Sequence, residues 1–275
     1  MTRIVFIAAL SAIASVGCVD DNRTPSGSHD SGLPTLDCLP NLDGRIDADE
    51  MPVAIEREAN YLLRENTNVD LTGSAGANGA LTWNYPDETV DDARVVFAAT
   101  PVTTQWYADT FPDATFSLAN DAMGLLVGVY RKDDDGLWLL GMASRDEDSS
   151  GGKTLFRYND PVALFRFPIQ NGDRYTEVGV IEDSTLSGLP YAGTDTYEIV
   201  IDGSGRLVLP YVGFEPVLRS YTYVLREPAA GGVNTSRRQV SFLFECFGEL
   251  ARATSQADET EPNFTNAAEL RRFSL

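Results

Sequence analysis

Short apolar runs that alternate with turn-forming residues, from residue 52 onward, are the feature that most limits the possible folds of this chain. The runs are rich in β-branched and aromatic residues, and Gly, Asp, Asn and Pro separate them. This spacing is typical of an all-β domain, and no segment keeps a helical period over a useful length. We therefore expect an all-β fold for residues 38–256, either an antiparallel β-sandwich or a curved half-open barrel. Residues 257–275 are expected to form a polar C-terminal tail, either frayed or folded into a small helix.

The expected strands follow the apolar runs and end at the turn residues. They comprise residues 53–64, 81–85, 93–99, 114–118, 125–131, 137–144, 154–158, 162–167, 176–182, 196–201, 206–209, 217–226 and 239–254. Apolar side chains alternate at Tyr197, Ile199 and Ile201, as in a strand with one solvated face. Asp135-Gly136 and Asp202-Gly203-Ser204-Gly205 each separate two apolar runs and therefore predict hairpin turns.

Residues 1–17 have the pattern of an export signal. Arg3 supplies the positive charge, residues 4–16 form an apolar run, and small residues precede Cys18. The apolar run is too short to span a bilayer well. The stretch Ser15-Val16-Gly17-Cys18 resembles a bacterial lipobox, with Ser15 in place of the usual Leu, and this resemblance makes Cys18 the expected lipidation site. The alternative is an ordinary signal peptide that is cleaved near Gly17 and leaves Cys18 free.

A lipidated Cys18 would tether the protein to a membrane through a spacer. A diacyl group anchors strongly because two chains are buried in the bilayer. In lipoproteins with this motif, a residue other than Asp after the Cys directs the protein to the outer membrane, and Val19 follows here. Residues 18–37 are then the lipidated Cys and a disordered spacer, because residues 19–37 have too few apolar side chains to offset the entropy of ordering. Random-coil scaling gives this spacer a reach of about 25 Å.

The segment 38–51 is the only stretch whose spacing suggests a metal site. With Gly44 at position 6 of a twelve-residue calcium loop, the remaining ligand positions fall on Asn41, Asp43, Arg45 through its carbonyl, Asp47 and Glu50. Position 1 is Leu39 rather than Asp, so one carboxylate of the usual set is missing. Calcium is thus the one cofactor that the sequence suggests. The alternative is that Asp43-Gly44 forms a β-turn before a short strand.

Two cysteines remain once Cys18 is assigned to the anchor. Cys38 and Cys246 form an even pair in a chain that is expected to be exported, which predicts a disulfide between them. The bond would close a loop of roughly 200 residues. In the chain-entropy model, a loop of that length stabilises the folded state by about 4–5 kcal/mol, as an upper value.

Composition excludes several classes of function. The single histidine, His29, lies in the spacer, so the expected domain has no imidazole for a Ser-His-Asp or Cys-His site, a His-ligated zinc or a His general base. No Gly-rich phosphate loop is present. The chain carries 41 acidic and 21 basic residues, and a formal net charge of −20 repels nucleic acid.

Paired carboxylates are the one catalytic arrangement left open. Glycoside hydrolysis needs two acids about 5–10 Å apart, and Trp83 and Trp106 offer surfaces on which sugars stack. With 41 acidic residues, however, such pairs arise by chance. No individual catalytic residue is therefore assigned.

The lipobox, the polar spacer, the segment Cys38-x-x-Asn41-x-Asp43-Gly44 and the β domain together resemble uncharacterised cell-envelope lipoproteins of bacteria. Residues 161–172 and 203–219 belong to the same similarity. The resemblance implies secretion and a β-sheet scaffold, and it carries over no catalytic residue.

The expected function is that of a non-enzymatic, membrane-tethered binding or structural module of the cell envelope. Its partner is expected to be a protein, a glycan or an apolar ligand, besides the membrane itself. If the sheet forms a curved barrel, we expect an apolar cavity lined by residues such as Tyr221, Tyr223, Phe242 and Phe244. The alternative function is a carboxylate-based glycoside hydrolase that acts on envelope or exogenous polysaccharide.

Overall fold

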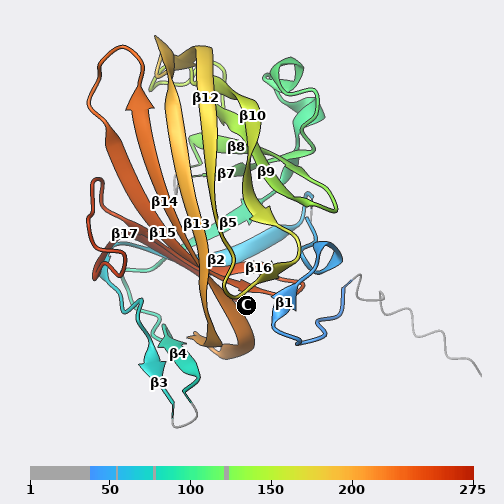
Figure 1. Ribbon diagram of the computed structural model, residues 1–275, viewed down its shortest axis with the longest axis vertical. Helices are drawn as coiled ribbons and strands as arrows, with labels where there is room; N and C mark the ends of the chain where they lie inside the picture. Colours follow the sequence, from blue (N-terminus) through green and yellow to red (C-terminus); the bar gives the residue numbers. More distant parts are fainter. Residues whose placement is uncertain (1–37, 54, 77–78, 121–123) are drawn as a thin grey trace, which may run out of the picture. The chain divides into compact units, whose positions relative to one another are not determined.

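The computed structural model describes residues 38–53, 55–76, 79–120 and 124–275. Strands dominate these ranges, and the only helical turns among them are short 3-10 turns at Ala48–Glu50, Val102–Thr104 and Ala108–Thr110. The all-β prediction is therefore confirmed (Figure 1). The export signal, Cys18 and the spacer lie outside the described residues. Within the described ranges, no helix is long and apolar enough to cross a membrane.

The strands vary from two residues to 21 residues in length. Their bounds are β1 Arg45–Ile46, β2 Glu58–Asn68, β3 Ser74–Ala75, β4 Leu81–Asn84, β5 Ala93–Ala98, β6 Thr100–Pro101, β7 Phe116–Ala119, β8 Leu126–Lys132, β9 Gly136–Ser144, β10 Leu155–Arg166, β11 Ile169–Gln170, β12 Arg174–Leu186, β13 Leu189–Leu209, β14 Val212–Pro228, β15 Thr235–Phe244, β16 Gly248–Ser255 and β17 Asn266–Phe273.

The main sheet curves until its two ends meet. Its strand order is β5-β2-β17-β16-β15-β14-β13-β12-β10-β9-β8-β7-β6, with antiparallel pairing along this path. The first and last strands of this order, β5 and β6, are separated in sequence only by Ala99. The chain itself thus joins the two ends of the sheet, which forms a nearly closed, barrel-like curve (Figure 1).

Strand β13 corrects one expected turn. The stretch Asp202-Gly203-Ser204-Gly205 does not reverse the chain, because it lies inside β13, where the ladder with β14 shifts register. Strand β4 pairs in parallel with β13 at this point, and a Cβ on Gly205 would lie 2.2 Å from the carbonyl oxygen of Leu81. These glycines therefore give room to a neighbouring backbone. The expected turn at Asp135-Gly136 is confirmed, since Asp133 N donates to Gly136 O at 3.1 Å between β8 and β9.

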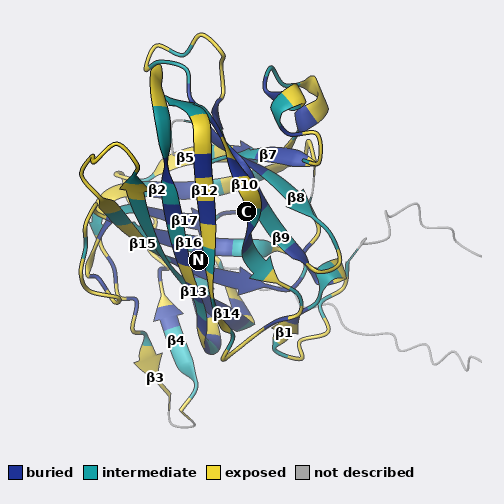
Figure 2. Cartoon of the chain, turned by 45° about the horizontal axis from the view of Figure 1, so that its top comes forward, coloured by how far each residue is buried: buried dark blue, intermediate teal, exposed yellow. Residues whose placement is uncertain are grey.

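The same register shift changes the face that β13 buries. Before it, Ile199 and Ile201 pack in clusters on one face of the sheet. After it, Leu207 and Leu209 pack with Trp83 in the cluster of the other face. A bulge has this effect because it adds one residue to the alternation. Buried and less buried residues alternate from Gly193 to Leu209 (Figure 2).

The C-terminal residues also correct an expectation. Residues 257–275 are not a polar tail or a small helix, because Asn266–Phe273 form β17 between β2 and β16. Ala267 and Leu270 are buried in the core. The expected strand 239–254 is two strands, with a reversal at Cys246 and Phe247, where Cys246 has a φ of 67°.

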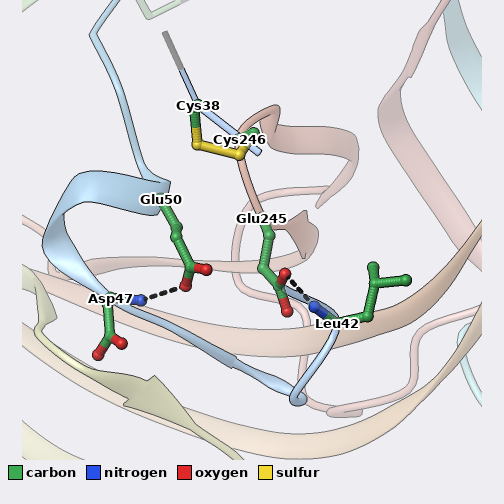
Figure 3. The surroundings of a disulfide bond; sticks show 6 residues. All are labelled: Cys38, Leu42, Asp47, Glu50, Glu245 and Cys246. Atoms are coloured by element: carbon green, nitrogen blue, oxygen red, sulfur yellow. Dashed lines mark hydrogen bonds between the residues drawn. A yellow bond between two sulfur atoms is a disulfide. The ribbon is translucent and has the colours of Figure 1, made fainter. Parts of the chain in front are cut away.

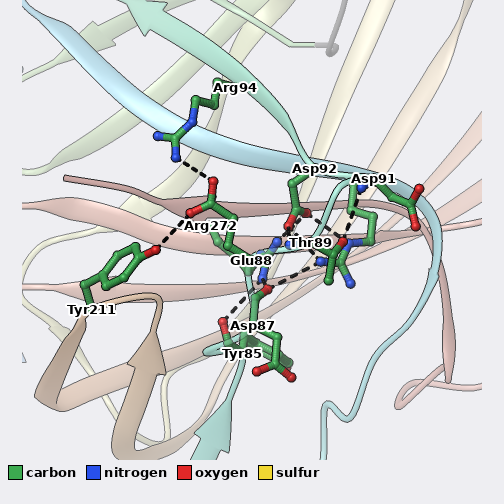
Figure 4. A network of polar contacts seen from close by, with 10 residues as sticks. Tyr85, Asp87, Glu88, Thr89, Asp91, Asp92, Arg94, Tyr211 and Arg272 are labelled. Atoms are coloured by element: carbon green, nitrogen blue, oxygen red, sulfur yellow. Dashed lines mark hydrogen bonds and ion pairs between the residues drawn. The ribbon is translucent and has the colours of Figure 1, made fainter.

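A buried ion-pair network holds β17 to the loop before β5 (Figure 4). Asp92 and Arg272 form an ion pair and are 1% and 2% exposed. Arg64 donates to both oxygens of Asp92, at 2.9 and 2.7 Å. Burial raises the pKa of Asp92, but the hydrogen bonds from Arg64 and Thr89 and the charge of Arg272 outweigh it and lower the pKa to about 2. The network therefore keeps a buried carboxylate ionised.

Candidate functional site

A cavity of about 470 Å³ lies against the inner face of the curved sheet. Residues from β8, β9, β10, β13, β14, β15 and β16 line it. Strands β8 and β16 are far apart in the order of the sheet, so their side chains meet in one cavity only because the sheet curves around it. The cavity is a direct product of the near closure of the sheet.

The cavity has a buried apolar end and an exposed end. Leu139 and Tyr197 are only 3% and 4% exposed and form part of its apolar lining. Thr235, Arg237 and Ala257 also line the cavity but are exposed to solvent. We call these two groups the floor and the mouth. A ligand with an apolar body can bury that body on the floor, since burial of apolar area is the main favourable term.

Arginines form the polar part of the lining. Arg226, Arg237 and Arg252 lie on β14, β15 and β16, and the described residues that line the cavity include no Asp or Glu. This lining contrasts with the net charge of −20 of the chain. The described lining thus carries cationic side chains in an acidic protein, and two of these arginines pair with carboxylates outside the lining.

Arg226 is held in place by a buried carboxylate. Its Nε and Nη2 atoms donate to the two oxygens of Asp195 at 2.8 and 2.6 Å. Asp195 is fully buried and also accepts a hydrogen bond of 2.7 Å from the hydroxyl of Tyr158. Burial lowers the pKa of Arg226, but the hydrogen bonds and charge of Asp195 outweigh it and raise the pKa. Arg226 therefore stays charged. Its Nε and Nη2 atoms are already hydrogen-bonded to Asp195.

Arg252 belongs to a second polar group on the same face. Gln239 Nε2 donates to Ser241 Oγ at 3.2 Å, and Ser241 Oγ donates to Glu249 Oε2 at 2.7 Å. Arg252 Nε lies 3.5 Å from Glu249 Oε1 and is buried without a hydrogen-bond partner among the described residues. A buried cationic N–H without an acceptor is costly, and an anion that reached it would gain a charge-assisted bond.

Tyr130 adds a hydroxyl to the lining of the cavity. Burial raises its pKa, and Glu249 raises it further, while Arg252 and Arg271 act in the opposite direction. The hydroxyl is therefore protonated at neutral pH and can donate one hydrogen bond.

The four residues expected to line an apolar cavity lie elsewhere. Phe242 and Phe244 are buried in the packed cluster around Trp83, where the rings of Trp83 and Phe242 are 5.0 Å apart. Tyr221 accepts a hydrogen bond from Arg238, whose guanidinium lies over the ring of Tyr223. The prediction of a cavity-lining role was wrong for these residues because they lie on the opposite face of β14 and β15. Other residues of the same two strands, whose side chains point to the opposite face, line the cavity instead. They are Val224, Arg226, Arg237 and Gln239.

The residues of the expected calcium loop form local turns. Asn41 Oδ1 accepts from Asp43 N at 2.8 Å, and Asp43 Oδ1 accepts from Arg45 N at 2.9 Å. Asp47 forms an ion pair with the Arg45 side chain, and Glu50 Oε2 accepts from Asp47 N at 3.0 Å. Among the residues that the structure describes, no group of three or more His, Cys, Asp or Glu side chains converges. Calcium binding by Asn41, Asp43, Arg45, Asp47 and Glu50 stays a prediction.

The predicted disulfide is confirmed. Cys38 and Cys246 are bonded across a sequence separation of 208 residues, and their Cα atoms are 5.6 Å apart (Figure 3). Cys246 N also donates to Glu50 O at 2.6 Å. The bond therefore joins the first described segment to the turn between β15 and β16.

The segment that follows Cys38 covers one end of the inner face. Ile46 and Met51 are buried in a cluster with Ile201, Leu218 and Leu243. The strand β1 in this segment pairs with β11. The segment is thus part of the packed interior of the β domain.

A smaller cavity of about 340 Å³ lies where the two ends of the sheet meet. Residues of β5, including Val95 and Phe97, face Ser117 and Ala119 of β7 and Val127 of β8 across it. Its position marks the seam of the curved sheet.

The arginines of the large cavity were missed by reasoning from the sequence. The only available signal was their spacing, since Arg226 shares a face with Val224, and Arg237 with Gln239, by alternation along a strand. That spacing does not say that the two strands meet β8 and β9 across a cavity. Protein-family models, curated proteins and solved structures were compared with the chain, and none of them matches it.

Proposed function

We propose that this protein is a non-enzymatic lipoprotein of the bacterial cell envelope that binds a small ligand inside its curved sheet. The observation that carries this proposal is the cavity of about 470 Å³ with a buried apolar floor and an exposed mouth. Ligand sites of proteins usually occupy about 300–1,000 Å³ and have mostly apolar walls with a few placed polar groups. The cavity has this size and this character.

The tether is the second part of the proposal. The lipobox-like stretch ending at Cys18, the polar spacer and the resemblance to cell-envelope lipoproteins support attachment to a membrane by a diacylated Cys18. The identity of Val19 supports the outer membrane. A tethered protein with an internal cavity would bind its ligand close to the membrane surface.

The scaffold suits binding more than hydrolysis. Asp195 and Glu249 fix two of the arginines from behind, so the polar groups of the site are held before a ligand arrives. The described lining of the cavity offers no pair of carboxylates in the arrangement that glycoside hydrolysis uses. The favoured role is therefore that of a binding protein.

Displacement of solvent from the cavity by an uncharged fluorescent probe tests the proposal. We expect saturable enhancement of N-phenyl-naphthylamine fluorescence by the exported chain carrying Cys18→Ser, which lacks acyl chains of its own. Leu164→Trp fills the cavity and should weaken probe binding at least about tenfold, because the probe and the indole compete for the same volume. Leu189→Trp, at a site 69% exposed, is the matched control and should bind as the parent does.

Melting curves of both variants show whether the fold is kept. Equal probe affinity of the parent and a folded Leu164→Trp variant would exclude this cavity as the site. Absence of saturable probe binding by the parent protein, together with no heat on titration of an alkyl ligand, would reject the proposed function itself.

A further inference from the structure

The arginines of the cavity are unusual for this chain. Only 21 of its 275 residues are basic, against 41 acidic ones. Even so, three arginines line a single cavity, and no described Asp or Glu shares that lining. Removing a charged side chain from water costs free energy unless it pairs with an opposite charge, either of the protein or of a ligand. The partners of each arginine therefore decide which of them is available to a ligand.

Arg226 is already paired, while Arg237 is not. The guanidinium of Arg226 already donates two hydrogen bonds to Asp195. The side chain of Arg237 has no hydrogen bond, ion pair or ring contact among the residues that the structure describes, and it is exposed at the mouth. Arg252 forms an ion pair with Glu249 and lies opposite Ser241, four residues along β15 from Arg237.

The carboxylate beside the mouth is occupied. Asp258 Oδ1 accepts from the backbone N and the hydroxyl of Ser236, at 2.7 and 3.4 Å. Asp258 thereby holds Ser236 in place next to Arg237 without pairing with an arginine of the cavity in any described contact. The guanidinium of Arg237, the cation of the mouth as defined, thus remains available to a ligand from outside.

We propose that the ligand is an amphipathic anion, whose apolar body lies on the floor formed by Leu139 and Tyr197 and whose anionic group is bound by Arg237 at the mouth. This inference rests on the proposed function and specifies the ligand class of the same cavity. A carboxylate fits because it accepts two parallel bonds from one guanidinium. A phosphate monoester of the same chain length presents the same chemistry.

Three ligands of one chain length separate the contributions of tail and head group. Decanoate, decanol and decyltrimethylammonium are titrated against the bound N-phenyl-naphthylamine, below the concentrations at which they form micelles. We expect decanoate to displace the probe at a concentration about tenfold lower than decanol, and the cationic ligand to be weaker than both. Decyl phosphate, as a fourth ligand, shows whether the site prefers a carboxylate or a phosphate.

Variants assign the head group to its residues. Arg237→Gln should reduce the advantage of decanoate over decanol to about threefold or less. Arg206→Gln removes an exposed arginine from β13 outside this lining and is the matched control. Because Arg237 is exposed, its replacement should leave the melting temperature unchanged.

The outcomes distinguish the ligand class from the function. If the probe binds but decanol and decanoate displace it equally, the anionic ligand is rejected and the binding function stands. If the advantage of decanoate survives in the folded Arg237→Gln variant, the assignment to Arg237 is overturned. If neither the probe nor decanoate binds, by fluorescence and by calorimetry, both proposals fail together.

Discussion

Two buried glutamates lie at the joint between the first described segment and the turn after β15. Glu50 is 6% exposed and Glu245 is 1% exposed, and their side chains point toward the same space (Figure 3). Glu245 Oε2 accepts from Leu42 N at 2.6 Å, whereas its Oε1 is buried without a partner among the described residues. Burial is the main cause that raises the pKa of Glu50, and the charge of Glu245 raises it further. The joint therefore favours a protonated Glu50.

The raised pKa of Glu50 makes stability depend on pH. The folded state binds the proton more tightly than the unfolded state, so this contribution to stability is fully present below the ordinary glutamate pKa. It is lost as the pH rises through the raised pKa of the folded state. Glu50→Gln keeps a neutral side chain and should give a higher melting temperature than the parent at neutral pH, with a difference that shrinks in acid.

Asp49→Asn is the control for this prediction, because it removes one charge from an exposed position of the same turn. Melting temperatures of the three proteins are measured across the acid range. A Glu50→Gln variant that parallels the parent at every pH would show that Glu50 does not titrate in this way.

At the scale of elements, the sequence predicts most strands, but not how they pair. Alternation and turn residues place β4, β5, β8 and β9 close to their observed bounds. Gly203 and Gly205 favour a turn in the sequence because Asp202 and Ser204, which lie beside them, are also common in turns. Their actual role depends on β4, which is more than a hundred residues earlier in the chain. No local pattern reports such a contact.

The close approach of β4 to β13 predicts a severe effect of Gly205→Ala. The added Cβ would lie 2.2 Å from Leu81 O and 3.1 Å from the ring of Trp83, so β4 or the indole must move. Overpacking of this kind costs about 1–3 kcal/mol. Gly151→Ala is the control, since the closest atom to its Cβ would be 3.9 Å away. Denaturant unfolding of both variants tests the prediction, and equal midpoints would contradict it.

At the scale of the whole molecule, the disulfide was predictable and the cavity lining was not. Counting cysteines in a chain that is expected to be exported leaves a single pair, and that pair is bonded. The cavity requires β8 and β16 to face each other, which follows from the closure of the sheet and not from any segment.

The proposed tether gives a prediction for the intact protein. Cells that express the chain should incorporate labelled palmitate into it, and Cys18→Ala should abolish the label and release the protein from the membrane fraction. Cys38→Ser, which breaks the disulfide without touching the lipobox, should keep the label. A wild-type chain that fractionates with soluble proteins and takes up no label would favour the ordinary signal peptide.

The link through Ala99 also bears on how such molecules behave when crowded together. Anchoring on a membrane confines proteins to two dimensions, where neighbours meet often and an open strand edge would recruit them into shared sheets. In this protein the two outermost strands, β5 and β6, are consecutive in the chain, and Ala99 forms a bridge with Ile55. The two ends of the sheet thus lie next to each other and not on opposite sides of the molecule. For the proposed membrane-anchored protein, we expect this single-residue link to hinder such recruitment at high surface density.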